Sequence, residues 1–219
     1  MACLLLYCID ATPPFHPSLL THTLPLFLPI TTLTPDSEIG SGTGLVGLSL
    51  ASSSQFQSRE VVVTDQKDHL GLIQRNVDAN SNKLHAPLFV RELDWLSDGE
   101  EEGGNGRASI TSSPFDVIVG TDVAYCKELY APVVHALEKV AGPESLILLG
   151  VTRTDTGPLF FQLLHQAGFD YCLLPTAVGD GGEGSCVEAG GFALFSVVRR
   201  GRGGRERREG ERDELNGNG

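Results

Sequence analysis

The sequence predicts an α/β fold, a doubly wound and mostly parallel sheet with one antiparallel strand near its C-terminus. Three observations lead to this prediction. Strand-like apolar runs alternate with helical patterns, as in sheets that are covered by helices. A Gly-rich turn separates the first strand from the first helix. The last two strand-like runs, 169–174 and 192–198, are separated by a Gly-rich loop at 179–191 without room for a crossover helix, so they should form a hairpin.

The first elements surround the Gly-rich turn at 38–44. An apolar run over 45–51 predicts the helix that follows this turn, and 61–65 is a β-branched run that predicts the next strand. Apolar residues at spacings of three and four over 70–79 predict a second helix with one buried face. A short strand around 88–93 then ends at Asp94 and Trp95.

The later elements repeat the alternation. Residues 115–120 are continuously apolar apart from Asp116, which predicts a strand buried on both faces at the centre of the sheet. A helix is expected over 127–141 and is stopped by Gly142 and Pro143, and a buried strand follows over 145–150. One more helix over 157–167 ends at Gly168, and the hairpin completes the domain, which we predict over residues 38–198.

Three segments fall outside this pattern. Residues 1–37 contain six prolines and no Lys or Arg, which predicts an irregular Pro-rich segment. Residues 97–114 are acidic and rich in Gly and Ser, so we expect a solvated, flexible insertion. The tail at 199–219 consists mainly of Arg, Gly and Glu and should be disordered; its acidic residues favour a solvated tail over an RNA contact.

Composition excludes several classes of function. The net charge of −12 argues against binding nucleic acid through its phosphates. The five cysteines show no metal-ligand spacing, which predicts reduced thiols, no metal site and a cytoplasmic location, with the nucleus as a second compartment. Prolines interrupt the apolar stretch at 19–33, so we expect no membrane segment. We also expect a monomer.

The Gly-rich turn predicts a ligand site because Gly allows positive φ and a close approach of the backbone. Its pattern, E-x-G-x-G-x-G, differs from the dinucleotide fingerprint G-x-G-x-x-G in spacing and in the leading Glu38. S-adenosylmethionine has no pyrophosphate but carries a cationic amino-acid end, and a carboxylate beside the turn suits that charge directly or through water. Asp65, about 20 residues further on at the next strand end, can accept hydrogen bonds from ribose hydroxyls.

The next strand end adds Asp94 and Trp95, where a carboxylate can accept from the adenine amine and an indole can pack on the base. Each feature alone has an ordinary explanation: a Gly turn of another α/β protein, an Asp that caps a helix, a Trp in the core. Their occurrence in this order favours the cofactor site. The predicted cofactor-binding residues are Glu38, Gly40, Ser41, Gly42, Thr43, Gly44, Asp65, Gln66, Asp94, Trp95 and Thr121.

After the central strand, Thr121 leads into the motif D-x-x-Y, Asp122 to Tyr125. Together with EIGSGTGLVGL, VVVTD, LDW and FDVIVGTDVAY, this motif resembles the family-16 protein methyltransferases, over residues 38–198. The resemblance implies a seven-strand methyltransferase fold and transfer of methyl from S-adenosylmethionine to lysine side chains of a protein, such as a chaperone or a translation factor. It implies Asp122 and Tyr125 as catalytic residues; the alternatives are that Asp122 caps the next helix and that Tyr125 packs on the sheet.

The chain departs from the family pattern before Glu38, where members have an apolar strand and this chain has Pro35, Asp36 and Ser37. We therefore expect the strand to be compromised by a truncation, an altered exon boundary or an unreliable gene model, and cofactor binding to be weak or absent. Three alternatives stay open: a non-catalytic binding or scaffold relative, a methyltransferase for a small molecule or a nucleic acid, and a nicotinamide enzyme, which the loop spacing disfavours.

Overall fold

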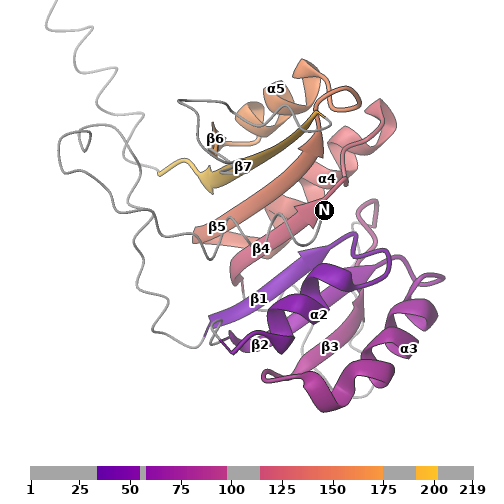
Figure 1. Cartoon of the computed structure of the whole chain (residues 1–219). Coiled ribbons are helices and arrows are strands. Elements are labelled where there is room, and N and C mark those ends of the chain that lie inside the picture. The colour runs from indigo at the N-terminus through magenta and orange to yellow at the C-terminus, as the bar shows by residue number, and fades with distance from the viewer. Residues whose placement is uncertain (1–33, 55–57, 98–113, 175–190, 202–219) are drawn as a thin grey trace, which may run out of the picture.

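The computed structural model describes residues 34–54, 58–97, 114–174 and 191–201, drawn in colour in Figure 1. In these ranges seven strands form one sheet in the order β3-β2-β1-β4-β5-β7-β6. The strands are β1 (Thr34–Ile39), β2 (Ser58–Asp65), β3 (Leu88–Glu92), β4 (Phe115–Thr121), β5 (Ala141–Thr152), β6 (Phe169–Leu173) and β7 (Phe192–Arg199). The helices are α2 (Leu45–Ser52), α3 (Leu70–Asn80), the 3-10 turn η2 (Ser81–Lys83), α4 (Lys127–Val140) and α5 (Pro158–Gln166).

The topology is the predicted one. Strand β7 runs antiparallel to both of its neighbours, β5 and β6, and the other strand pairs are parallel. The order reverses between β1 and β4, where the chain leaves one half of the sheet and begins the other. In such a sheet the crevice at the carboxyl ends of these two strands is the place where ligands bind.

Helices cover both faces of the sheet, and alternate residues of each central strand serve the two faces. On β2, Val62 packs into the cluster that includes the apolar residues of α4 and α5, whereas Val61 and Val63 pack into the cluster that includes those of α2 and α3. On β4, Ile118 and Val119 divide in the same way. This double burial explains why the central strands are continuously apolar in the sequence.

Strand β1 contradicts the prediction that the chain up to residue 37 is irregular. It lies between β2 and β4 and pairs with both, with Glu38 opposite Val63 on one side and Val119 on the other. Backbone hydrogen bonds to two neighbours do not depend on apolar side chains, so the polar residues do not prevent the strand from forming. Pro35, which has no N–H, lies at an irregularity of the register next to Thr34, a position where a strand tolerates proline.

The polar side chains of β1 are buried at a cost. Asp36 is 6% exposed and accepts a hydrogen bond from the hydroxyl of Ser58 on β2. The hydroxyl of Ser37 is fully buried and finds no partner among the described residues. A buried hydroxyl without a hydrogen bond costs ~1–3 kcal/mol, so β1 is present but less stable than an apolar strand would be.

Strand β5 is longer than predicted. Helix α4 ends at Val140, and β5 begins at the next residue, so Gly142 and Pro143 belong to the strand rather than to a separate loop. The hydroxyl of Ser145 accepts the N–H of Gly142 at 2.7 Å and donates to the carbonyl of Phe115 on β4, which ties this start to its neighbour. Gly142 and Pro143, which the sequence predicts to end the helix, therefore lie where the register of the β4–β5 pair is irregular.

The predictions for residues 1–33, for most of the 97–114 insertion, for nearly all of the 179–191 loop and for the tail beyond residue 201 concern residues outside the described ranges. Within those ranges, no helix combines the length and the apolar character needed to cross a membrane.

Candidate functional site

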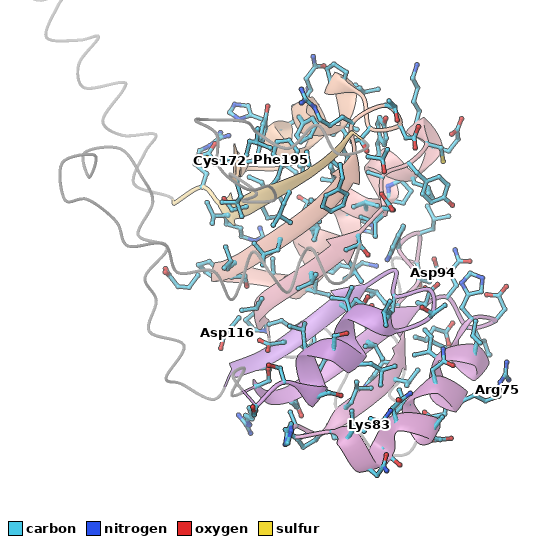
Figure 2. The ribbon with its side chains drawn as sticks, in the orientation of Figure 1. Arg75, Lys83, Asp94, Asp116, Cys172 and Phe195 are labelled. Atoms are coloured by element: carbon cyan, nitrogen blue, oxygen red, sulfur yellow. The ribbon has the colours of Figure 1, made fainter. Side chains whose placement is uncertain are left out.

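Four adjacent strands, β3, β2, β1 and β4, deliver the predicted site residues to one edge of the sheet. Because the four strands are parallel, their carboxyl ends lie side by side. In Figure 2, Asp94 lies on the edge toward which these strands point, and Asp116, near the start of β4, lies on the opposite edge. The acidic residues that follow these strands in the sequence therefore also lie along one edge of the sheet.

The Gly-rich turn adopts the conformation that its sequence predicts. Gly40, Gly42 and Gly44 have φ values of 59°, 56° and 75°, a conformation that is unfavourable for residues with a Cβ. A Cβ on Gly40 would lie 2.9 Å from both the Trp95 ring and Val123, whereas a Cβ on Gly42 would meet nothing within 4 Å. The surface of the turn is thus packed at Gly40 and open at Gly42.

Ser41 and Thr43 have roles within the protein. The N–H of Ser41 donates to the carbonyl of Thr64 at 2.9 Å, and the N–H of Thr64 donates back to the Ser41 hydroxyl at 3.0 Å. Ser41 is 7% exposed, so its side chain fastens the turn to β2. Thr43 is exposed, and its carbonyl accepts a hydrogen bond from the amide of Asn76 on α3 at 2.8 Å.

Glu38 lies beneath the turn. Its side chain accepts the N–H of Gly47 in the first turn of α2 at 2.8 Å, and only 2% of the residue is exposed. Burial raises the pKa of this carboxyl from 4.5 to about 7, although the Gly47 and Ser41 hydrogen bonds act in the opposite direction. Glu38 thus joins β1, the turn and α2, and a direct contact with a ligand, one of the two possibilities predicted, is not available in this arrangement.

Asp65 connects the end of β2 with the turn. Its Oδ2 accepts the N–H of Gly42 at 2.8 Å, and its Oδ1 accepts the N–H of Gln66 at 2.8 Å. His69 Nδ1 lies 2.7 Å from the same Oδ1, and this bond raises the pKa of the imidazole. A carboxylate oxygen can accept two hydrogen bonds, so Oδ2 keeps room for a ligand hydroxyl.

His69 is a member of the site that the sequence analysis missed. The signal that could have found it is the i, i+4 spacing from Asp65 across the start of α3.

Asp94 and Trp95 follow β3. Asp94 Oδ1 accepts the N–H of Leu96 at 2.9 Å, a local turn that leaves the carboxylate at the edge of the sheet. The Trp95 ring packs against Gly40, and its carbonyl is 2.9 Å from His135 Nδ1 on α4. The indole nitrogen is buried and has no hydrogen-bond partner among the described residues. A buried donor of this kind beside an open glycine turn fits a ligand that carries hydrogen-bond acceptors.

The turn after β4 presents Asp122 and Tyr125 and buries the two residues between them. Asp122 has a φ of 52°, rare for a residue with a side chain, and Tyr125 is 60% exposed. Val123 and Ala124 are 2% and 0% exposed. Val123 packs against Gly40, which brings this turn to the Gly-rich turn. Thr121, predicted to bind the cofactor, ends β4 and pairs with Gly150 on β5.

Both structural alternatives for the D-x-x-Y motif are wrong. Asp122 does not cap helix α4, because the residue that precedes this helix is Cys126 and the cap has no side-chain hydrogen bond. Tyr125 does not pack on the sheet, because its exposed fraction is too large.

Among the described residues, no group of three or more His, Cys, Asp or Glu side chains is placed to hold a metal ion.

This chain is similar in sequence to known proteins. A family model described as lysine methyltransferase matches residues 37–167. Protein N-lysine methyltransferase METTL21A of Mus musculus is 32% identical over 131 residues, 59% of this chain and 55% of that protein. EEF1A lysine methyltransferase 3 of Xenopus tropicalis is 30% identical over 127 residues, 57% of this chain and 50% of that protein. The chain thus spans about half the length of the curated relatives that it matches.

Among solved structures, ribosomal protein L11 methylase from Lactobacillus delbrueckii subsp. bulgaricus superposes with a TM-score of 0.53 at 13% identity, over 78% of this chain and 72% of that one. At this identity the likeness concerns the fold alone, a seven-stranded methyltransferase sheet.

Proposed function

Because this chain belongs to the lysine methyltransferase family, whose model matches residues 37–167, we propose that it transfers a methyl group from S-adenosylmethionine to lysine side chains of a protein. The single observation that carries the proposal is the D-x-x-Y turn beside the Gly-rich turn. There, Tyr125 is exposed, Asp122 is partly buried, and Val123 between them packs against Gly40 of the Gly-rich turn.

The residues at the strand ends fit the proposed cofactor. Asp65 Oδ2 can accept from a ribose hydroxyl, and the unpaired Trp95 Nε1 can donate to a ligand acceptor. Buried Glu38 places a carboxylate under the turn, where a cationic ligand favours its charged form. We propose that Asp65 and Trp95 hold S-adenosylmethionine, which supplies an activated methyl group when bound, and that Glu38 supports the turn without touching the ligand.

The chain's own contribution to the reaction is alignment. A free lysine has a pKa of about 10.4, and it must lose a proton before its nitrogen can attack. A carboxylate favours the ammonium form, so we assign to Asp122 the task of orienting the amine rather than that of removing its proton. The exposed ring of Tyr125 can close one side of the amine site, and the proton can leave to water at this open edge.

Two finer proposals go with this function. We propose that the substrate is a translation factor or a chaperone; the name of one relative includes EEF1A, which supports the first of these. We also propose a monomer in the cytoplasm or the nucleus; the odd number of cysteines favours reduced thiols, which suits these compartments. Identifying the labelled protein and fractionating cells that express the tagged chain would test these points.

Cofactor binding can be tested with two glycine variants. Gly42 and Gly168 both have positive φ, 56° and 85°, and a Cβ on either meets nothing within 4 Å. G42A and G168A should therefore carry a similar backbone strain, on the order of 1 kcal/mol. Only G42A places a methyl group on the open surface of the Gly-rich turn. We expect calorimetric titration with S-adenosylmethionine to give binding for wild type and G168A and a loss of about tenfold or more for G42A.

Activity can be tested with radiolabelled methyl transfer into a cell lysate. We expect a labelled protein band with wild type that fades in Asp122→Asn. Asp116→Asn is the matched control, because Asp116 is an exposed residue of β4, the strand that ends just before Asp122, and lies at the opposite edge of the sheet. Label only in RNA or small metabolites would support the alternative acceptors, and no label despite cofactor binding would support a non-catalytic relative.

A further inference from the structure

The D-x-x-Y turn is held by the segment that ends β5 and leads to α5. The N–H of Asp122 donates to the carbonyl of Gly150 at 2.8 Å, and the hydroxyl of Thr156 donates to the carbonyl of Ala124 at 2.8 Å. A third bond reaches the side chain itself: the hydroxyl of Thr152 donates to Asp122 Oδ1 at 2.9 Å. Two bonds therefore fix the backbone of the turn, and one bond fixes the carboxylate.

Thr152 is itself rigidly placed. It is the last residue of β5 and pairs with Phe192 on β7. Its carbonyl accepts the N–H of Asp155 at 3.0 Å and the N–H of Thr156 at 2.9 Å, so its backbone is fixed on both sides. A β-branched side chain has restricted χ1 freedom, and the hydroxyl therefore has a defined position relative to the sheet.

Asp122 needs such support. Its φ of 52° is a conformation that persists only where the surroundings enforce it. Its side chain is only partly buried, so packing alone does not select one rotamer. Among the described residues, Thr152 is the one side chain that bonds to this carboxylate, through Oδ1, and Oδ2 is left for another donor.

We propose that Thr152 is a positioning residue that holds Asp122 with Oδ2 available to the N–H of the acceptor amine, an inference that rests on the proposed methyl transfer. In that transfer the nitrogen lone pair forms the N–C bond, the C–S bond breaks with its electron pair remaining on sulfur, and the surplus proton leaves to water. Thr152 gains and loses no proton. Its contribution is to reduce the number of orientations that the amine can adopt.

Three variants test this role. Thr152→Val keeps the branched shape but removes the donor, and Thr152→Ser restores the donor without the methyl group. Thr154→Val is the matched control, because Thr154 is exposed in the same segment and its hydroxyl bonds to Asp155 rather than to Asp122. We measure kcat, KM for the protein substrate, cofactor affinity by calorimetry, and the Asp122 side-chain conformation in crystal structures of the variants.

We expect kcat of Thr152→Val to fall about tenfold or more with cofactor affinity unchanged, Thr152→Ser to recover most of the rate, and Thr154→Val to match wild type. In the Thr152→Val crystal, Asp122 should occupy more than one rotamer. A wild-type rate in Thr152→Val, a loss that Thr152→Ser does not recover, or an Asp122 that stays ordered without the hydroxyl would each overturn the inference while leaving the proposed function intact. A wild-type chain that binds cofactor but methylates no protein would refute both.

Discussion

Replacing Glu38 by Gln should change how the stability of this protein depends on pH. The carboxyl is buried beneath the Gly-rich turn, and burial raises its pKa from 4.5 to about 7. The folded protein therefore binds this proton more tightly than the unfolded chain does. The resulting stabilisation is complete below about pH 4.5 and is lost as the pH rises toward about 7.

The size of the effect follows from the two pKa values. Each pKa unit corresponds to about 1.4 kcal/mol, so a rise from 4.5 to about 7 corresponds to ~3 kcal/mol of unfolding free energy. Gln resembles the protonated carboxyl, and its oxygen can still accept the N–H of Gly47. The difference in stability between E38Q and wild type should therefore shift in favour of E38Q by ~3 kcal/mol between about pH 4 and about pH 8.

Urea denaturation of both proteins across this range, without cofactor, measures the difference directly. Other titrating groups, including His69 with its raised pKa, are present in both proteins, so their contributions cancel to first order in the difference. The values at the acidic end serve as the internal control, because both side chains are neutral there. If the unfolding free energies of E38Q and wild type changed in parallel with pH over the whole range, the argument that burial raises the pKa of Glu38 would be refuted.

Gly47→Ala should destabilise the fold by ~3 kcal/mol in denaturation experiments, because the added Cβ would lie 2.1 Å from Val63 Cγ1. Helix propensity alone predicts a gain in stability of about 1 kcal/mol, so a measured gain would contradict this packing. S-adenosylmethionine should change the intrinsic fluorescence of Trp95, the only Trp of the chain. An unchanged spectrum at saturation would show that the indole does not lie at the cofactor site. Asp65→Asn should weaken cofactor binding about tenfold or more by calorimetry, because the amide NH2 would replace the oxygen that accepts from either Gly42 or Gln66; unchanged affinity would show that Asp65 does not bind the cofactor.

The sequence predicted the order and type of the described elements from α2 to β7, apart from the 3-10 turn η2, because their periodicity is local. Continuous apolar runs marked strands that are buried on both faces, and three-and-four spacings marked helices with one buried face. It also predicted that acids at successive strand ends would gather, because parallel strands place their carboxyl ends at one edge.

Strand β1 could not be predicted from local sequence patterns. Its residues are polar and include Pro35, so local preference predicts irregular structure. The strand forms because β2 and β4 present backbone donors and acceptors on both of its sides, and these partners lie far away in the sequence. Helix α4 and strand β5 show the same limit, since the pairing with β4 decides where the strand begins.

The candidate site divides in the same way. The sequence by itself determined which residues stand at the ends of the later strands, from Asp65 to Asp122, because position along a strand is a local property. Only the tertiary structure decided what each one touches: Glu38 is buried against Gly47, Asp65 accepts the N–H of Gly42, and Asp122 is held by Thr152. These contacts join segments that the fold brings together, and their geometry depends on register and burial rather than on any local pattern of residues.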